Sequence, residues 1–414
     1  MNFFSRYKKI FLIAGFLILV AIMAYLLWAV FFRSAPAEAP VTEPPVGGGL
    51  FPAAGPGGPL TGEGAGGPGA LPDSGSVTGA PDPNAPSPVA IGGLTKTQPL
   101  TESTILNPTL SKNGGVQYYD KNDGRFYRID ETGQPVRLSD RIFHNVKSVT
   151  WAPDKDRAIL EYPDGNKILY NFSTKQQVTL PAHWQDFSFS PSSNQIVSKS
   201  LGLDPENNWL VVSSDDGSRA TAIENIGTNG QAVYSSWSPN NQIIAMYTEG
   251  IDFNRQELFF VGLNDENFKS TVIEGRGFQP EWSTEGDRLL YSVYNTDTNL
   301  NPNLWIVDAK GDTISQNRRN LSLSTWASKC TFAANTTVYC AVPETLERGA
   351  GLFPELADQT RDNLYKIDLV NGTQELIAVP DGTYNISEIL VPPANGYLYF
   401  TDKKTGQLYQ IRLQ

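Results

Sequence analysis

The chain has 414 residues, of which 18% are charged, and its formal net charge is −11. This length is too great for one small domain and fits one large all-β domain with additional segments. The acidic balance argues against a nucleic-acid partner, because phosphate binding needs clustered Lys and Arg, and only Arg318-Arg319 and the first ten residues offer basic groups close together.

The N-terminus reads as a membrane anchor. Residues 1–9 are short and basic, and residues 10–32 form an apolar run without a charge. About 20 such residues span a bilayer as a helix, whereas the apolar core of a signal peptide is shorter. The excess of basic residues before the run places residues 1–9 in the cytoplasm and the rest outside. A cleaved signal peptide is the alternative, since Ala35-Pro36-Ala37 weakly resembles a cleavage site.

Residues 33–93 have the composition of a flexible linker. They consist mainly of Pro, Gly, Ala, Ser and Thr and contain hardly any large apolar side chain. Such a segment buries too little surface to offset the entropy of ordering, so we expect it to be disordered. Its predicted role is to tether the folded part at a distance from the membrane.

The remainder, 94–414, contains a repeated aromatic motif. Trp237-Ser238-Pro239-Asn240 precedes a short apolar run that suits a buried strand, and Pro and Asn favour the turn between them. Similar aromatic anchors occur at intervals of 38, 48, 45 and 44 residues, at Trp151, Phe189, Trp237, Trp282 and Trp326. We interpret them as residues that pack one repeat against the next. A period of 40–45 residues in a strand-rich sequence is typical of propeller blades.

Degenerate anchors at 110–115 and 390–396 extend the pattern to seven units. Each unit contains short strands joined by tight turns, and several show an Asn-Gly or similar turn before a fourth strand. The last unit ends without that strand, and residues 96–101 resemble the outer strand of other units. We therefore predict an all-β, seven-bladed β-propeller closed by the N-terminal strand 96–101, with six or eight blades as alternatives.

The repeat resembles that of TolB-type propellers, which are related in architecture to WD-repeat propellers. The matching residues are Trp151-Ala152-Pro153-Asp154, Phe189-Ser190-Pro191, Trp237-Ser238-Pro239-Asn240 and Trp282-Ser283. The resemblance covers about residues 94–414 and implies an extracytoplasmic binding module. TolB itself has an α/β domain before its propeller, and in this chain a helix and a linker take that place.

The two cysteines, Cys330 and Cys340, bracket a predicted hairpin that turns near Asn335. Such a hairpin places the two positions opposite each other, within the Cα separation that a disulfide requires. We predict a cross-strand disulfide, with two buried free thiols as the alternative. A disulfide also suits an exported domain.

The sequence shows no pattern typical of a catalytic, cofactor or metal site. It lacks His-Glu-x-x-His and a nucleophile elbow, and His144 and His183 read as isolated loop residues. Residues 120–124 superficially resemble a calcium loop but lack the later bidentate Glu, so a hairpin turn is the expected structure. We therefore predict no cofactor and no metal.

Unequal loops suggest where a partner binds. The connections between second and third strands are tight in blades 1, 2 and 7 and longer in blades 3 to 6, near residues 202–208, 250–255, 295–303 and 343–363. Long loops in compact domains often carry function, although solvated loops without a role are the alternative. Aromatic and Arg residues dominate binding hot spots, which makes Phe253, Arg255, Arg348 and Phe353 the candidate anchors.

Two classes of function remain. The first is a membrane-tethered scaffold in the cell envelope, periplasmic or at the cell surface, that binds a protein or a surface polymer. The second is a propeller enzyme that acts on an envelope glycan or peptide in its central funnel. The inner strands offer only scattered acids for such chemistry, Asp186, Glu281 and Glu388.

Overall fold

The computed structural model describes residues 19–23, 25, 93–130, 133–393 and 396–413. Residues 19–23 and 25 are helical, and the rest of the predicted anchor 10–32 lies outside the described residues, as do residues 1–9 and nearly all of the linker 33–93. Within the part that is described, no helix has both the length and the apolar character to cross a bilayer. The folded domain belongs to the second of two units, Val77–Gln414, and is considered by itself.

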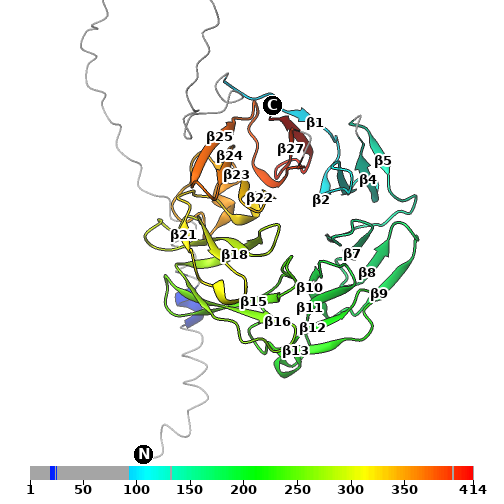
Figure 1. The fold of residues 1–414 in the computed structure, drawn as a ribbon, viewed down its shortest axis with the longest axis vertical. Helices are drawn as coiled ribbons and strands as arrows, with labels where there is room; N and C mark the ends of the chain where they lie inside the picture. The colour runs from blue at the N-terminus through cyan, green and yellow to red at the C-terminus, as the bar shows by residue number, and fades with distance from the viewer. Residues whose placement is uncertain (1–18, 24, 26–92, 131–132, 394–395, 414) are drawn as a thin grey trace, which may run out of the picture. The chain divides into compact units, whose positions relative to one another are not determined.

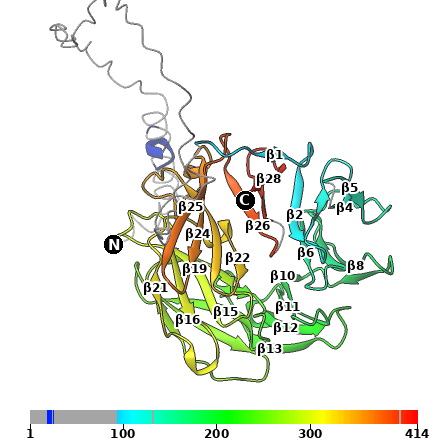
Figure 2. The same cartoon turned by 45° about the horizontal axis from the view of Figure 1, so that its top comes forward.

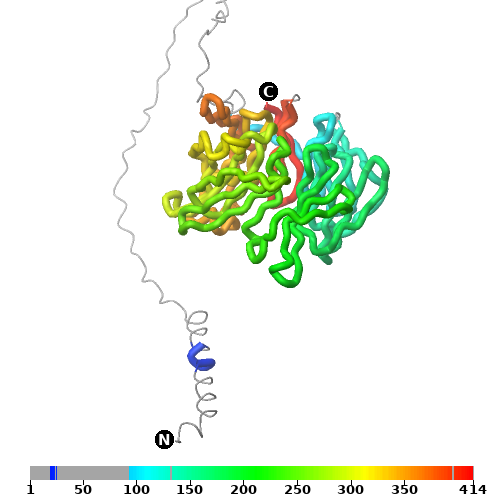
Figure 3. The backbone as a smooth tube through the Cα atoms, turned by 60° about the horizontal axis from the view of Figure 1, so that its bottom comes forward, coloured from blue at the N-terminus to red at the C-terminus, as the bar shows by residue number. Residues whose placement is uncertain are grey.

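Seven four-stranded antiparallel sheets make up the described part of this unit, which confirms the predicted seven-bladed β-propeller. The blades follow one another around a ring in chain order, as the colours in Figures 1 and 3 show. Blades 1 to 3 contain β2 (Ile105–Leu110), β3 (Val116–Asp120), β4 (Arg125–Ile129), β5 (Pro135–Arg137), β6 (Ser148–Trp151), β7 (Arg157–Glu161), β8 (Lys167–Asn171), β9 (Gln177–Leu180), β10 (Trp184–Phe189), β11 (Gln195–Ser200), β12 (Trp209–Ser214) and β13 (Thr221–Asn225).

Blades 4 to 6 contain β14 (Val233–Ser235), β15 (Ile243–Gly250), β16 (Gln256–Gly262), β17 (Thr271–Ile273), β18 (Arg276–Trp282), β19 (Arg288–Tyr294), β20 (Asn303–Asp308), β21 (Arg319–Asn320), β22 (Cys330–Ala334), β23 (Thr337–Pro343), β24 (Asp362–Asp368) and β25 (Thr373–Ala378). Short 3-10 helices lie in connections: η1 (Pro205–Asn207), η2 (Gly311–Thr313), η3 (Ala327–Lys329) and η4 (Pro354–Ala357).

Blade 7 joins the two ends of the domain. It contains β26 (Ile386–Leu390), β27 (Tyr397–Asp402) and β28 (Leu408–Arg412), and its outer strand is β1 (Gln98–Pro99). β1 pairs antiparallel with β28, with Gln98 opposite Gln410, so that the C-terminal end of the domain lies beside β1 (Figures 1 and 2). This pairing removes an open seam from the ring, and Pro99 is tolerated because the strand is an edge strand.

The Ser of the repeated motif fixes the turn between the first two strands. Ser238 Oγ accepts a hydrogen bond from the Ile243 amide N–H at 2.9 Å, and Asn241 adopts a positive φ of 63° in the same turn. Ser190 and Ser283 repeat this arrangement in blades 3 and 5. Asn tolerates this backbone region better than most residues, so the motif encodes the turn locally.

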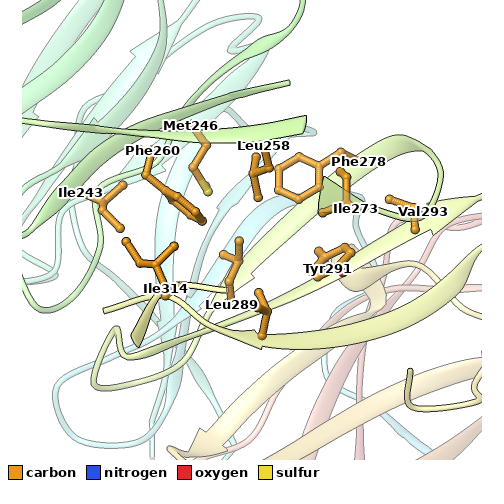
Figure 4. Packing of buried hydrophobic residues seen from close by; sticks show 12 residues of the cluster. Ile243, Met246, Leu258, Phe260, Ile273, Phe278, Leu289, Tyr291, Val293 and Ile314 are labelled. Carbon is orange, nitrogen blue, oxygen red and sulfur yellow. The ribbon is translucent and has the colours of Figure 1, made fainter. Parts of the chain in front are cut away.

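The core consists of clusters in which neighbouring blades meet face to face. Between blades 4 and 5, Met246 and Phe260 point toward Leu289 and Tyr291 (Figure 4). The first strands of neighbouring sheets contact one another, which places β2, β6, β10, β14, β18, β22 and β26 innermost. Side chains on the two surfaces of each blade are therefore the ones that hold the ring together.

Candidate functional site

The connections between second and third strands all lie on one side of the ring, because the strands of each blade alternate in direction. In blades 3 to 6 these connections are residues 201–208, 251–255, 295–302 and 344–361. In blade 1 the corresponding connection is only 121–124, a hairpin turn in which the Gly124 amide donates to the Asp120 carbonyl at 3.0 Å. The predicted difference in loop length is thus present for blades 3, 5 and 6, whereas the blade 4 connection is as short as those of blades 2 and 7, which are residues 162–166 and 403–407.

Three of these loops bind one another directly. The Asn254 amide Nδ2 donates to Thr296 Oγ1 at 2.7 Å, which joins the loops of blades 4 and 5. The Gly349 amide donates to the Asn299 carbonyl at 2.9 Å, which joins the loops of blades 5 and 6. Residues 251–255, 295–302 and 344–361 therefore form one braced surface, which we call the loop face.

The loop of blade 3 is separate from the loop face. Asn208 Nδ2 donates to the Gly227 carbonyl and Asn225 Nδ2 donates to the Glu206 carbonyl, at 2.8 and 2.9 Å, so this loop is fixed to its own blade. Among the described residues, no hydrogen bond connects it to the loop of blade 4. All four predicted loops therefore lie on one side of the ring, and described hydrogen bonds connect three of them.

All four predicted anchor residues lie on the loop face and are exposed. Phe253 is 55% exposed and Phe353 is 53% exposed, and they are the only exposed phenylalanines among the described residues. The Arg255 guanidinium is held by Asp252, with Nε 2.8 Å from Oδ2. Arg348 makes no ion pair with another described residue. The rings of Phe253 and Phe353 and the unpaired guanidinium of Arg348 thus face solvent on loops that hydrogen bonds connect.

A pocket of about 170 Å³ lies on the inner side of the blade 6 loop. Trp326, Lys329, Asn385 and Lys403 contribute to its walls together with η4. Lys403 Nζ is paired with Asp358 at 2.5 Å, which ties the blade 6 loop to blade 7. The pocket is part of the loop face and was not predicted, because its residues come from five separate segments.

Beneath this pocket lies a buried ion pair. Lys329 Nζ donates to Asp362 Oδ2 at 2.8 Å and to Asn385 Oδ1 at 2.9 Å, and Asp362 Oδ2 also accepts the Ile386 amide at 2.6 Å. Burial lowers the pKa of the Lys329 ammonium, although Asp362 opposes this shift, and burial raises the pKa of the Asp362 carboxyl. Asp362 Oδ1 has no hydrogen-bond partner among the described residues. No sequence signal links residues so far apart along the chain.

The repeated aromatic residues pack as blade-to-blade contacts at four positions. Trp151, Phe189, Trp237 and Trp282 each contact the core cluster that contains residues of the preceding blade. Trp151 Nε1 also donates to the Asn107 carbonyl of blade 1 at 2.8 Å.

Trp326 departs from the expected position. It precedes η3 and packs against Leu346, Ala350 and Ala357 beneath the long loop, instead of lying on an inner strand. Phe332, on β22, packs against the cluster at the junction of blades 5 and 6. The inner strand of blade 6 begins only at Cys330, so spacing alone aligned the wrong aromatic residue.

The structure confirms the predicted disulfide. Cys330 and Cys340 lie directly opposite each other on β22 and β23, with Cα atoms 4.1 Å apart, and they are bonded. Both side chains are buried in the cluster between blades 5 and 6.

The three acids of the inner strands differ in their surroundings. Asp186 pairs with Lys199 at 2.9 Å and accepts the Ser235 amide at 3.0 Å. Burial raises the pKa of Glu281 and of Glu388 to about 7 in each case, and Glu388 Oε2 has no hydrogen-bond partner among the described residues. Glu281 is nevertheless exposed to solvent, whereas Glu388 is half-buried, so the raised pKa is better supported for Glu388. Two carboxyls with such a pKa are chemically suited to proton transfer.

Comparison with known proteins identifies the fold and not the family. No family model matches this chain, and no curated protein matches it. Oligogalacturonate lyase from Vibrio parahaemolyticus has 11% identity and a TM-score of 0.50, with 76% of this chain and 93% of the lyase covered. A structure of prolyl endopeptidases has 11% identity and a TM-score of 0.51, with coverage of 76% and 49%. The Cps50 (Swd1) propeller domain of Myceliophteria thermophila has 12% identity and a TM-score of 0.48, with coverage of 77% and 100%.

At such low identity, the first two similarities show the propeller architecture alone. The resemblance to TolB-type propellers stays a prediction, because no family is identified.

Proposed function

We propose that this chain is a binding module whose loop face holds a partner protein. The observation that supports the proposal is that hydrogen bonds connect the three loops of the loop face, on which Phe253 and Phe353 are exposed to solvent. Ordering an interface costs less when its loops are already positioned. Buried aromatic side chains also dominate the centre of many interfaces.

The chemistry of the loop face specifies the kind of partner. The exposed rings of Phe253 and Phe353 would pack against an apolar patch on the partner. The unpaired Arg348 guanidinium would bind a carboxylate of the partner near that patch. A hollow of about 410 Å³ beside the same loop, next to Leu346 and Leu356, offers a place for an apolar side chain. We therefore expect a partner with an apolar surface that has an acidic margin.

Site-specific photocrosslinking in the native cells tests this proposal. A photoreactive amino acid is placed at position 253 or 353, and at position 370 as the matched control. Val370 is 68% exposed but lies in the turn after β24, on the opposite side of the ring. We expect the same discrete adduct from positions 253 and 353 and none from 370. Equal adducts at all three positions, or none at 253 and 353, would reject the loop face as the interface.

For its location, we propose a single membrane anchor at residues 10–32, a cytoplasmic N-terminus and a propeller in the periplasm or at the cell surface. The support is the uncharged apolar run, the linker composition of residues 33–93 and the resemblance to the TolB-type repeat. Alkaline extraction of membranes should leave the full chain in the membrane and release a variant lacking residues 1–33. Release of the full chain would contradict the anchor.

A second candidate function is an enzyme that acts on an envelope glycan or peptide in the channel. It is favoured by Glu281 and Glu388, whose pKa burial raises to about 7. Incubation with isolated cell-wall glycan and peptide fractions, followed by mass spectrometry of the products, tests it. Products that the wild type forms and that both Glu281→Gln and Glu388→Gln fail to form would favour the enzyme. If the wild type forms no products from either fraction, the binding module is favoured instead.

A further inference from the structure

The pocket on the inner side of the blade 6 loop is bounded by three neighbouring blades. Gln279 comes from β18 of blade 5, whereas Ser387 and Lys403 come from blade 7. Trp326 precedes η3 of blade 6, and Lys329 ends it. Every residue that lines the pocket belongs to the described part of the chain. The pocket therefore lies where three blades meet at the base of the loop face.

Two cations and one carboxylate line this pocket. Lys329 is bound to Asn385 and to Asp362, whose side chain is fully buried. Lys403 is bound to Asp358 at 2.5 Å, and these two side chains are 48% and 40% exposed. Ion pairs with such exposure contribute little to stability, because water solvates both partners. The pair of Lys403 and Asp358 is therefore the one that a ligand can exchange.

The free hydrogen-bonding groups of the lining are mainly donors. An ammonium group has three N–H donors, and the Lys403 side chain uses one of them within the described part of the chain. The Gln279 side-chain amide accepts from Ser328 at 3.2 Å, and its Nε2 makes no hydrogen bond to a described residue. The carboxylate of the lining, Asp358, is already bound to Lys403. The pocket thus favours a ligand that is rich in acceptors.

The size of the pocket suits a short group. Its volume of about 170 Å³ equals that of about five or six water molecules, each of which takes about 30 Å³ in the liquid. Trp326, Pro354 and Ala357 add apolar walls to the polar ones. A carboxylate on a short aliphatic stem matches both kinds of wall, because its oxygens accept from ammonium and amide groups and its stem contacts the apolar side chains.

We propose that this pocket binds a carboxylate group of the partner protein, which takes the place of Asp358 on Lys403. The exchange keeps the local charges balanced, since one carboxylate replaces another. The blade 6 loop stays attached to blade 7, because Asn385 Nδ2 still donates to the Ala357 carbonyl at 3.0 Å. The proposal rests on the proposed function, because the carboxylate belongs to the acidic margin expected of the partner.

The test uses the full chain in detergent and three small probes. N-acetylalanine carries a C-terminal carboxylate, N-acetylglutamate α-amide carries a side-chain carboxylate, and N-acetylglutamine α-amide is the neutral control. Saturation-transfer difference NMR detects weak binding up to about 10 mM ligand. We expect at least one carboxylate probe to bind saturably and the neutral probe not to bind. A preference for either carboxylate supports the site and shows whether a chain terminus or an acidic side chain enters it.

Two exposed substitutions should change the affinity in opposite directions. Lys403→Met removes the cation and should weaken binding by about tenfold or more, since a hydrogen bond between charged groups contributes that much. Asp358→Asn removes the internal competitor and should strengthen binding by about threefold, which corresponds to the loss of an exposed ion pair. Arg361→Gln and Glu344→Gln alter a similarly exposed ion pair of the same loop, so these matched controls should bind like the wild type.

Near-ultraviolet circular dichroism verifies that each variant is folded. Absence of saturable binding by both carboxylates, equal binding of the neutral probe, or equal effects of the matched controls would overturn the pocket as a carboxylate site. Failure of this proposal and failure of the proposed function are distinguishable. Photocrosslinked adducts at positions 253 and 353 without carboxylate binding would overturn the pocket alone, whereas carboxylate binding without adducts would overturn the loop face as the interface.

Discussion

The ring has two arcs that are held together in different ways. In blades 2 to 5, each junction with the preceding blade contains an aromatic residue from the repeat, namely Trp151, Phe189, Trp237 or Trp282. We call blades 2 to 5 the regular arc. We call blades 6, 7 and 1 the irregular arc. Phe332 packs at the junction of blades 5 and 6, and Leu390 and Leu110 both pack at the junction of blades 7 and 1.

The irregular arc also has connections that the regular arc does not share. The Cys330–Cys340 disulfide braces blade 6, and the buried pair of Lys329 and Asp362 joins blade 6 to blade 7 through Asn385. β1 closes blade 7 by pairing with β28.

The two arcs also differ in the chemistry of their side chains. The repeated core of the regular arc is apolar and determines the fold, whereas what blades 4 and 5 offer to a partner lies in their loops, such as Phe253. The blade 6 loop, the buried ion pair, the desolvated Glu388 and a cleft between blades 7 and 1 all belong to the irregular arc. Departures from the repeat are therefore where specific chemistry collects.

The largest expected effect is in the regular arc. Trp237→Ala removes a side chain that is only 5% exposed and leaves a cavity between blades 3 and 4. We expect the free energy of unfolding to fall by about 3–5 kcal/mol, measured by urea unfolding. Trp237→Leu, which reproduces the residue found at the junction of blades 7 and 1, should lose less. A loss below about 1 kcal/mol for the Ala variant would show that the repeat does not carry the stability.

In the irregular arc, Lys329→Met should cost about 3–5 kcal/mol of unfolding free energy, because it leaves the Asp362 carboxylate buried without its cation. Urea unfolding measures the loss. The double variant Lys329→Met with Asp362→Leu should be closer to the wild type, since no buried charge remains. Equal losses in the single and double variants would mean that packing, and not charge, explains the effect.

Reduction of the disulfide should have the next largest effect. Cys330→Ser is expected to lower the free energy of unfolding by about 2–3 kcal/mol, because the bond closes a loop with a sequence separation of 10. Thermal unfolding with and without a reductant tests this: the wild type should be destabilised by the reductant and the variant should not respond. A wild-type protein that does not respond either would show that the bond contributes nothing.

The smallest effect depends on pH. Burial raises the pKa of Glu388 from 4.5 to about 7 in the folded chain, so the folded state holds this proton more tightly than the unfolded state does. The resulting stability is present below about pH 4.5 and is lost as the pH rises through 7. Glu388→Gln should therefore be more stable than the wild type by about 1–2 kcal/mol at pH 8, a value reduced for partial solvent access, and similar at pH 4. A difference that stays constant with pH would exclude titration of Glu388 as its cause.

The fold could be predicted in detail because the residues that specify each turn and strand are close together in the sequence and recur in several blades. The Ser-Pro-Asn turn is encoded by neighbouring residues, as the Ser238 hydrogen bond to the Ile243 amide shows. The disulfide was predictable for the same reason, since a hairpin places Cys330 opposite Cys340. The candidate site was predicted only in part: loop length and the exposed Phe253 and Phe353 could be read from the chain.

The sequence by itself determined the propeller, the hairpin disulfide and the unequal loops, because each depends on residues close together along the chain. Only the tertiary structure decided that three loops are braced, that Trp326 supports the long loop, and that Lys329 meets Asp362 and Asn385. It alone revealed the cleft between blades 7 and 1, whose walls come from opposite ends of the domain. Closure of the ring brings residues that are far apart in the sequence into contact, and no local sequence pattern predicts which of them will meet.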